Sequence, residues 1–415
     1  MREMKDSGLQ WAGDIPQYWN IAKGKHFMAV LERPVRDDDN VITCFRDGEV
    51  TLRSNRREDG FTVATVEAGY QGIEPGDLVV HGMDGFAGAI GISDSRGKGT
   101  PALNVLSCSE NKKYIMYLLR AMAYTEVFMA LSTGIRVRTC DTNWKKLKSL
   151  DYLIPPADEQ QCIADFLDAK CAEIDALTAD IQTQIDTLEQ YKRSVITETV
   201  TKGLNPNAEM KDSGIQWIGN MPAHWDVVRG KYILHYMQKP VREDDGVITC
   251  FRDGEVTLRS NRREEGFTMS DKEIGYQGID VGDLVVHGMD GFAGSIGISD
   301  SRGKASPVLN VLDTDQCKRY IMYYLRSMAY SDVFLALATG IRVRSCDLRW
   351  TKLAELSYPV PPLDEQNAIV KHIDSVLSKA DAVIADKEAQ LATLDEYKKS
   401  LIFEYVTGKK EVPVS

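Results

Sequence analysis

The stretch Ile154-Pro155-Pro156-Ala157-Asp158-Glu159-Gln160 marks the start of the longest element that the chain encodes. Proline is excluded from helix interiors and restricts the residue before it, whereas acidic residues favour a helix N-terminus, so a helix should begin just after the Pro-Pro pair. From there to about residue 200 the chain contains no Gly or Pro. The same pattern returns 206 residues later as Val360-Pro361-Pro362-Leu363-Asp364-Glu365-Gln366. We therefore expect two long helices at matching places.

Apolar residues in both stretches recur with a period close to 3.5, which is typical of a coiled coil. One such helix cannot bury its own seam, the line of residues that packs on a partner helix, so the two should pair with each other, in antiparallel orientation. The predicted seam of the first helix consists of Ile174, Leu177, Ile181, Gln184, Leu188, Tyr191 and Val195. That of the second consists of Ile373, Val376, Ala380, Val383, Gln390, Leu394, Tyr397 and Leu401.

The 206-residue repeat covers the whole chain and is uneven. Between residues 41–106 and 247–312, 54 of 66 positions are identical, whereas fewer than half match in the helical stretches that follow. A chain with two copies of one domain can form a pseudo-twofold object, which suits a twofold target such as duplex DNA.

Each repeat begins with a mixed α/β domain. Short apolar runs at residues 77–80 and 89–92 are bounded by Gly and Asp, as strands are, and residues 112–131 have helical spacing. The fold class expected is α+β, with two globular domains in pseudo-twofold arrangement, separated by two long antiparallel coiled-coil helices.

Composition restricts the possible functions. A net charge of −11 argues against a protein that coats DNA unaided, unless its basic residues cluster or partner subunits add positive charge. No apolar run is long enough to span a membrane and no signal peptide is evident, so we expect a cytoplasmic protein. The eight cysteines include no Cys-x-x-Cys pair. Cys44, His81 and Cys140 form only a weak metal signal, and buried thiols explain them better.

Arginines gather in the most strongly repeated segment. Arg and Asn side chains read base edges and hold phosphates, although a solvated charged face would explain the same cluster. The candidate DNA-binding residues of this segment are Arg46, Arg53, Ser54, Asn55, Arg56 and Arg57, with mates Arg252, Arg259, Ser260, Asn261, Arg262 and Arg263.

A glycine-rich turn, residues 82–88, is the second candidate, since such turns let a backbone approach a ligand; a plain strand connection is the alternative. Paired basic residues elsewhere favour phosphate contacts. The candidates on the glycine-rich turn are Met83 and Asp84, with mates Met289 and Asp290. The paired basic candidates are Arg96, Lys98, Arg136 and Arg138, with mates Arg302, Lys304, Arg342 and Arg344.

Catalytic motifs are missing from the sequence. It contains no G-x-G-x-x-G after a strand, no P-loop, no G-x-S-x-G and no H-E-x-x-H, and the Pro-Pro pairs are not preceded by Asn or Asp and followed by an aromatic residue. A stand-alone methyltransferase or nuclease is therefore disfavoured. A coiled-coil scaffold that binds protein is a further alternative, against which the duplicated arginines weigh.

The chain resembles the specificity subunits of type I restriction–modification enzymes. The two Pro-Pro-x-x-Glu-Gln helix starts carry most of the resemblance, and Val281 in place of Pro75 is a small departure from it. The other matching segments are Ile15-Pro16-Gln17-Tyr18-Trp19, Met221-Pro222-Ala223-His224-Trp225, Pro75-Gly76-Asp77-Leu78-Val79-Val80, Thr133-Gly134-Ile135-Arg136 and Thr339-Gly340-Ile341-Arg342.

The resemblance implies a non-catalytic subunit that reads a bipartite site on double-stranded DNA. It implies two modification (methyltransferase) subunits and restriction (translocase–nuclease) subunits as partners, with S-adenosylmethionine, ATP and Mg on those partners and no cofactor or metal in this chain. The implied domains are target recognition domains at 1–154 and 210–360, a central spacer helix at 155–203, a linker at 204–209, a C-terminal spacer helix at 361–408 and a tail at 409–415.

Near-identity of the two recognition domains adds a sharper expectation. Two like domains related by a twofold axis should read the same half-site in opposite directions, so the target should be an interrupted inverted repeat.

Overall fold

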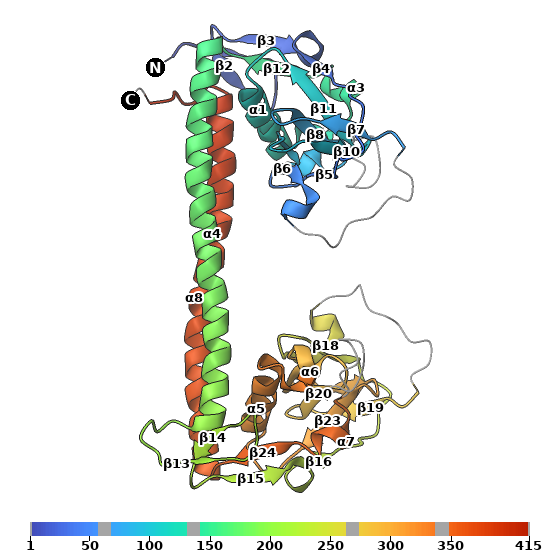
Figure 1. Ribbon diagram of the computed structural model, residues 1–415, viewed down its shortest axis with the longest axis vertical. Helices are drawn as coiled ribbons and strands as arrows, with labels where there is room; N and C mark the ends of the chain where they lie inside the picture. The colour runs from blue at the N-terminus through green and yellow to red at the C-terminus, as the bar shows by residue number, and fades with distance from the viewer. Residues whose placement is uncertain (1, 57–67, 131–141, 263–273, 337–347, 414–415) are drawn as a thin grey trace. The chain divides into compact units, whose positions relative to one another are not determined.

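The computed structural model describes residues 2–56, 68–130, 142–262, 274–336 and 348–413 (Figure 1). The chain divides into two compact units: unit 1 comprises residues 1–181 and 388–415, and unit 2 comprises residues 182–387. Each unit therefore contains one globular domain, the beginning of one long helix and the end of the other.

The domain of unit 1 is built on a four-stranded antiparallel sheet of order β4-β11-β8-β9, in which Leu103 lies opposite His81. The pairs β1–β2, β3–β12, β5–β6 and β7–β10 form smaller ladders. The strands are β1 (Met4–Asp6), β2 (Asp14–Pro16), β3 (Asn20–Lys23), β4 (Met28–Val30), β5 (Ile42–Cys44), β6 (Val50–Leu52), β7 (Gln71–Ile73), β8 (Leu78–His81), β9 (Ile90–Ile92), β10 (Gly97–Gly99), β11 (Leu103–Cys108) and β12 (Asp151–Ile154). The apolar runs predicted as strands are β8 and β9.

Unit 2 repeats this topology, with a sheet of order β16-β23-β20-β21. Its strands are β13 (Met210–Asp212), β14 (Asn220–Pro222), β15 (Asp226–Arg229), β16 (His235–Tyr236), β17 (Ile248–Cys250), β18 (Val256–Leu258), β19 (Gln277–Ile279), β20 (Leu284–His287), β21 (Ile296–Ile298), β22 (Gly303–Ala305), β23 (Leu309–Asp313) and β24 (Ser357–Val360).

The helix predicted over residues 112–131 is broken in two. The helices of unit 1 are α1 (Lys112–Tyr124), α2 (Val127–Ala130) and α3 (Trp144–Leu147), and those of unit 2 are α5 (Lys318–Tyr330), α6 (Val333–Ala336) and α7 (Trp350–Leu353). Glu126 lies between α1 and α2 with a φ of 60°, and Asp332 takes the same place in unit 2 with a φ of 54°. A residue in the left-handed region cannot continue a right-handed helix, so the helix ends before it. The helical spacing of apolar residues continues past this point, which is why the sequence did not show the break.

Buried tyrosines tie each domain to the long helices. The Tyr114 hydroxyl lies 3.0 Å from the carbonyl oxygen of Leu153 and 3.2 Å from that of Val406, and its side chain is fully buried. In unit 2 the Tyr320 hydroxyl lies 3.0 Å from the carbonyl oxygens of Val200 and Pro359. The C-terminal end of each long helix is thereby part of the domain core of its unit.

The two long helices are α4 (Ala157–Lys202, 46 residues) and α8 (Leu363–Val406, 44 residues), which confirms the predicted pair. The glutamine of each helix-start motif is buried and bridges two backbone segments. Gln160 accepts the backbone N–H of Asn111 at 3.0 Å and donates to the carbonyl oxygen of Pro155 at 2.9 Å. Gln366 makes the equivalent bonds to Cys317 and Pro361. The motif therefore fixes where the helix leaves the domain.

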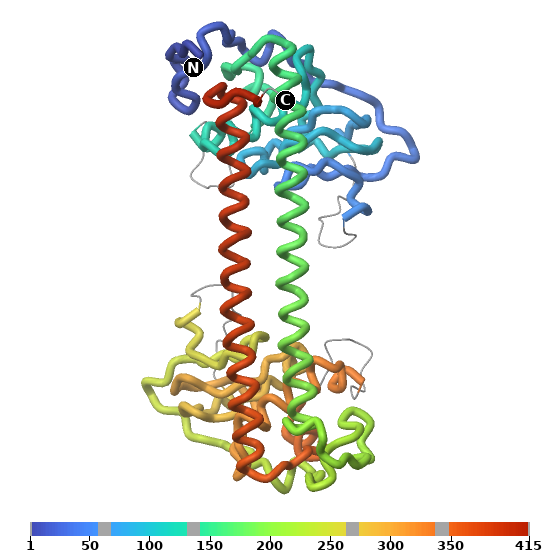
Figure 2. Tube along the Cα trace, turned by 90° about the vertical axis from the view of Figure 1, so that its left-hand side faces the viewer, coloured from blue at the N-terminus to red at the C-terminus, as the bar shows by residue number. Residues whose placement is uncertain are grey.

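In each unit the segments of α4 and α8 lie side by side and run antiparallel (Figure 2). In unit 1, Phe166 packs on Tyr405 with ring centroids 4.5 Å apart, and Lys398 bonds Asp175 at 2.6 Å. In unit 2, Lys192 pairs with Asp381 at 2.6 Å. Among the described residues, no helix has the length and apolar character needed to cross a bilayer.

The predicted seam is wrong at six positions, where the side chains are exposed. Leu177, Tyr191, Val383 and Tyr397 are 43–54% exposed, and Gln184 and Gln390 are exposed as well. The buried line passes one residue later, through Ile185 and Ile384 (8% exposed each), and through Lys192 and Lys398, whose side chains are 18% and 20% exposed. A lysine can bury its aliphatic stem while its ammonium reaches a carboxylate, so apolarity alone selected the wrong phase.

Candidate nucleic-acid interface

The arginine segment is a hairpin whose apolar side is locked into the domain. In unit 1 the buried side chains of Ile42, Cys44 and Val50 anchor β5 and β6, and the turn between the strands carries exposed charges. The turn closes through the backbone bond from Phe45 N–H to the Glu49 carbonyl, 2.8 Å. The buried side chains of the two strands thus hold the charged turn on a fixed support.

Arg46 is held against the glycine-rich turn. Its Nη2 lies 2.9 Å from Oδ1 of Asp84, and the corresponding Arg252–Asp290 distance is 3.2 Å. Both arginine side chains remain 67–68% exposed. The structure therefore brings two separate sequence candidates together, and each guanidinium keeps most of its surface open to a ligand.

Arg56 is held between an aromatic ring and two carboxylates. Its guanidinium carbon lies 4.3 Å from the Phe45 ring centroid, and Nη1 lies 2.6 Å from Asp47 and 3.2 Å from Glu49. Arg262 has the same surroundings in unit 2, at 4.3 Å from Phe251. An aromatic face and anionic partners both favour the cation and restrict its rotamers, which orients the side chain before a ligand arrives.

His81 organises the glycine-rich turn. Its Nδ1 accepts the backbone N–H groups of Met83 at 3.2 Å and Asp84 at 3.0 Å, and His287 accepts those of Met289 and Asp290 at 3.2 and 2.9 Å. Burial lowers the pKa of both histidines, although the aspartate opposes this effect. The turn leaves the Met83 and Met289 side chains 58% and 56% exposed. A neutral imidazole is therefore a structural part of the turn.

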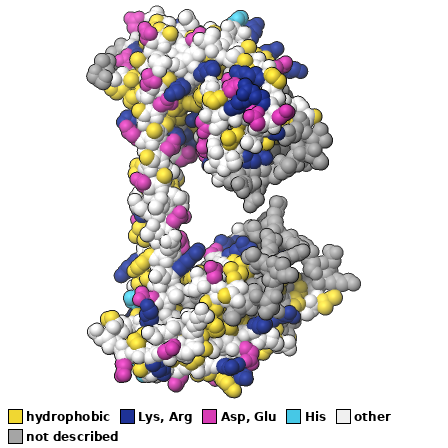
Figure 3. All heavy atoms as spheres, in the orientation of Figure 1, with side chains coloured by type: hydrophobic (Ala, Val, Ile, Leu, Met, Phe, Trp, Pro, Cys, Tyr) yellow, Lys and Arg dark blue, Asp and Glu magenta, His cyan; other side chains and the backbone are white. Residues whose placement is uncertain are grey.

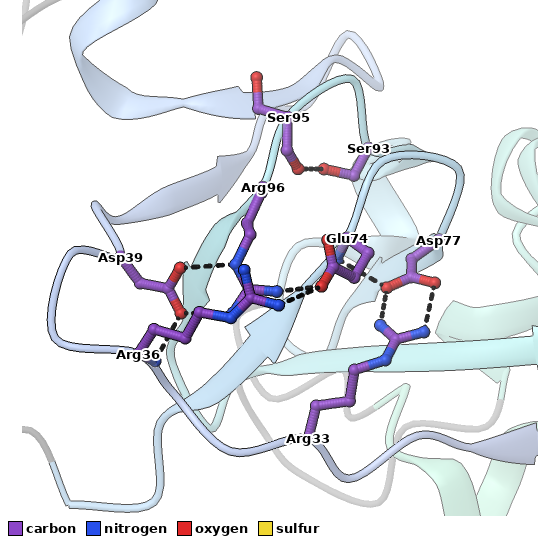
Figure 4. A network of polar contacts seen from close by, with 8 residues as sticks. All are labelled: Arg33, Arg36, Asp39, Glu74, Asp77, Ser93, Ser95 and Arg96. Carbon is purple, nitrogen blue, oxygen red and sulfur yellow. Dashed lines mark hydrogen bonds and ion pairs between the residues drawn. The ribbon is translucent and has the colours of Figure 1, made fainter.

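Arg96 belongs to an ion-pair network within the domain (Figure 4). Its Nε lies 3.0 Å from Asp39 Oδ1, Glu74 contacts the same guanidinium, and the Arg96 side chain is only 22% exposed. Burial raises the pKa of Asp39, but hydrogen bonds from the Arg36 backbone and from Arg96 outweigh it, so that the pKa is lowered. In unit 2, Arg302 pairs with Asp245 at 2.9 Å. These ion pairs stabilise the domain. The phosphate contact predicted for Arg96 and Arg302 stays a prediction.

The remaining described candidates lie along the hairpin and on β10. Arg53 donates to Thr43 Oγ1 at 3.3 Å and Asn55 to Thr51 Oγ1 at 2.8 Å, with Ser54 exposed between them. Arg259, Ser260 and Asn261 repeat this arrangement in unit 2. Lys98 and Lys304 are half-buried on β10 and β22.

Several candidates lie outside the described residues. These are Arg57, Arg136, Arg138, Arg263, Arg342 and Arg344. Cys140 of the weak metal set does too, and burial raises the pKa of the Cys44 thiol to about 12, which disfavours the thiolate that a metal needs. Within the ranges that the structure describes, His, Cys, Asp and Glu form no group of three or more suited to a metal ion.

Arg120 on α1 is an anchor that the sequence analysis missed. It is 8% exposed, and it donates from Nε to the Ile90 carbonyl at 2.8 Å and from Nη2 to the Gly48 carbonyl at 3.0 Å. Arg326 contacts the Asp253 carbonyl in unit 2. An arginine within the apolar face of a helix was the available signal, because a buried guanidinium requires acceptors on a neighbouring element. Here those acceptors include the turn that carries Arg46.

The exposed arginines of the turns are paired with carboxylates, which is how arginine-rich turns occur in a chain of net negative charge. Arg46 and Arg56 both have acidic partners, and Figure 3 shows basic and acidic side chains interspersed on the face in view. Exposed ion pairs contribute only about 0–1 kcal/mol each, so a phosphate or base edge can compete for these guanidinium groups.

No protein-family model matches the chain. It is 24% identical to a proposed specificity subunit of the type I restriction enzyme MjaX from Methanocaldococcus jannaschii, covering 96% of this chain and 95% of that protein. It is 19% identical to the type I restriction enzyme StySPI specificity subunit of Salmonella potsdam, covering 96% and 90%.

Among solved structures, a chain from a study of complex assembly and conformational transition of the type I restriction–modification system superposes with a TM-score of 0.67 at 13% identity. The match covers 95% of this chain and 99% of that one. The comparisons confirm the resemblance and the fold class inferred from the sequence.

Proposed function

We propose that this chain, like the type I specificity subunits that it resembles, is the non-catalytic DNA-recognition subunit of a restriction–modification enzyme. It reads a bipartite site and directs modification and restriction subunits to it. In this proposal two modification subunits dock on the chain, and S-adenosylmethionine, ATP and Mg²⁺ are bound by the partners.

The observation that carries the proposal is the duplication of one surface in atomic detail. The Arg46–Asp84 pair recurs as Arg252–Asp290, and the histidine that accepts two backbone N–H groups recurs with the same atom. Packing of a core does not require exposed pairs to be kept. An exposed arginine held by a turn suits guanine, whose O6 and N7 accept a bidentate guanidinium.

Two equal surfaces lead us to propose an interrupted inverted repeat as the target. The test is to co-express the chain with its cognate modification subunit and to map methylated adenines in the host genome. The expected result is two identical half-sites in opposite orientation. Two unrelated half-sites would refute the inverted repeat and leave a bipartite site in place.

Variants assign the reading surface. Arg46→Ala should relax one half-site and Arg46→Ala with Arg252→Ala should relax both, since a good bidentate contact contributes about 1–3 kcal/mol of discrimination. The matched control is Lys23→Ala, which removes another exposed, ion-paired cation from the same domain. If the control changed the methylation pattern as much as the arginine variants, the assignment to the hairpin would be wrong.

A further inference from the structure

Unit 1 contains an open cavity of about 690 Å³ at a place apart from the Arg46–Asp84 turn. It lies between β4, β7, β11 and the start of α3 and is bounded by aromatic and proline side chains together with polar ones. The lining residues that matter are Val30, Pro34, Tyr70, Pro101, Asn104 and Trp144.

The second unit shows what fits against the tryptophan of this cavity. There the Tyr236 ring stacks on Trp350, with centroids 5.9 Å apart and an interplanar angle of 25°. The residue at the position of Tyr236 in unit 1 is Val30, and the partner of Trp350 is Trp144. Valine brings no ring to the cavity, so unit 1 retains the indole platform without the tyrosine that covers it in unit 2.

The tryptophan of unit 1 is held in place before any ligand binds. The Trp144 backbone N–H donates to Asn104 Oδ1 at 3.1 Å, and Asn104 Nδ2 donates to the carbonyl oxygens of Val80 and Thr142, both at 3.1 Å. Unit 2 retains the bonds of Asn310 to its own neighbours. The platform is therefore common to both units, and only the space above it differs.

Charge at the cavity differs between the units as well. Lys145 and Glu32 line it in unit 1, whereas the corresponding residues of unit 2 are Thr351 and Gln238. An ammonium group next to an indole face offers a phosphate contact beside a stacking surface. Glu32 adds an acceptor for an amino group. Ring, phosphate and amino group together are the chemistry of a nucleotide.

We propose that this cavity, which we call the Trp144 subsite, binds a nucleobase stacked on Trp144 with its phosphate at Lys145. The proposal deepens the proposed function, on which it rests where the base belongs to DNA; a free nucleotide offers the same chemistry. The small side chain of Val30 leaves the subsite open in unit 1, whereas the Tyr236 ring occupies the corresponding place on Trp350 in unit 2.

The test uses the full chain and 2-aminopurine, whose fluorescence is quenched by stacking. One arm titrates 2-aminopurine ribonucleoside monophosphate, and the other a duplex containing the mapped site with 2-aminopurine placed at successive positions. A change of fluorescence at one duplex position alone assigns the subsite to a DNA base, and quenching of the nucleotide alone assigns it to a free ligand. Either result supports the subsite.

Reciprocal swaps between the units provide the controls. Val30→Tyr should close the subsite and abolish the fluorescence change, whereas Tyr236→Val should open a second subsite on Trp350. Trp144→Ala should weaken binding about 5- to 150-fold, as expected for loss of one base–aromatic stack. Thermal unfolding establishes that each variant folds.

Absence of any fluorescence change in both arms, or an equal change with wild type and Val30→Tyr, would overturn the subsite. Site-specific binding of an unlabelled duplex, measured in parallel, separates that outcome from failure of the proposed function, because duplex binding would then persist.

Discussion

Protonation of His81 and His287 should weaken DNA binding, although it adds positive charge. Nδ1 of each ring accepts two backbone N–H groups of the glycine-rich turn, so a proton on that atom would face two donors. Each bond contributes about 0.5–1.5 kcal/mol net, so each turn stands to lose roughly 1–3 kcal/mol. The turn carries the aspartate that holds Arg46, and disorder there removes a preset reading group.

The sign of the pH dependence follows from the lowered pKa. Burial places the folded-state pKa of each histidine below its ordinary value of 6.5. The neutral ring therefore stabilises the fold fully above pH 6.5, and this contribution is lost as the pH falls through the lowered folded-state pKa. A simple charge effect has the opposite sign, since an added cation strengthens phosphate binding.

The assay is fluorescence anisotropy of the full chain, with its modification partner, on the mapped duplex at fixed salt. Affinity should be constant from about pH 7.5 to about pH 6.5 and should fall from there toward about pH 5.5, as the pH passes into the range of the lowered folded-state pKa. Asparagine can place an amide oxygen where Nδ1 lies, so His81→Asn with His287→Asn should flatten this dependence. Glutamine places its oxygen farther along the side chain and should weaken binding at both pH values. Affinity that rises on acidification, in wild type and Asn variant alike, would refute the reasoning.

Three further changes test the hairpin support, the helix seam and the spacer. Gly48→Ala should lower the free energy of unfolding more than Gly76→Ala. Both glycines have a positive φ (+88° and +84°), but a Cβ at Gly48 would lie 1.9 Å from Arg120 Nη2, whereas a Cβ at Gly76 would have no atom within 4 Å. Chemical denaturation should show a difference of about 1–3 kcal/mol between the two variants, and equal losses would show that Arg120 does not support the hairpin. Ile185→Ala should destabilise by about 2–5 kcal/mol and the exposed Leu177→Ala by much less, and the reverse order in thermal melts would restore the seam predicted from the sequence. Inserting seven residues into both α4 and α8 adds about 10 Å of helix. The gap between methylated half-sites should then lengthen by about three base pairs. An unchanged gap in the methylome would show that the helices do not set it.

The elements that could be predicted are those that a local pattern specifies. The strands β8 and β9 follow from short apolar runs between turn residues, and the long helices from uninterrupted stretches after the two Pro-Pro pairs. The structure also explains the helix-start glutamines. The side-chain amides of Gln160 and Gln366 accept a backbone N–H through the oxygen and donate to a backbone carbonyl through the nitrogen, and they thereby bridge two segments of their unit.

The features that could not be predicted depend on distant partners. The seam phase was missed because Lys192 and Lys398 lie half-buried on it, with their ammonium groups paired to Asp381 and Asp175. The ion-pair network of Arg96 was missed because Asp39 lies 57 residues away in sequence. A single sequence gives the charges but does not show which of them meet. The arginine segment could be singled out from its composition and its repetition, while its pairing with the glycine-rich turn required the fold.

The two units now differ in a way that makes their roles separable. The Arg46–Asp84 surface is the same in both units, so a variant in one unit should relax one half-site and its mate the other, with similar effect. The Trp144 subsite breaks this equivalence, because Val30 and Lys145 have Tyr236 and Thr351 as mates. If the subsite takes a DNA base, then Val30→Tyr should lower the affinity of the complex for the symmetric duplex, because unit 1 loses a contact that unit 2 does not make. If it takes a free nucleotide, Val30→Tyr should leave the affinity for the duplex unchanged while abolishing nucleotide binding. Titration of the wild type and of Val30→Tyr with the symmetric duplex and with the nucleotide distinguishes these outcomes.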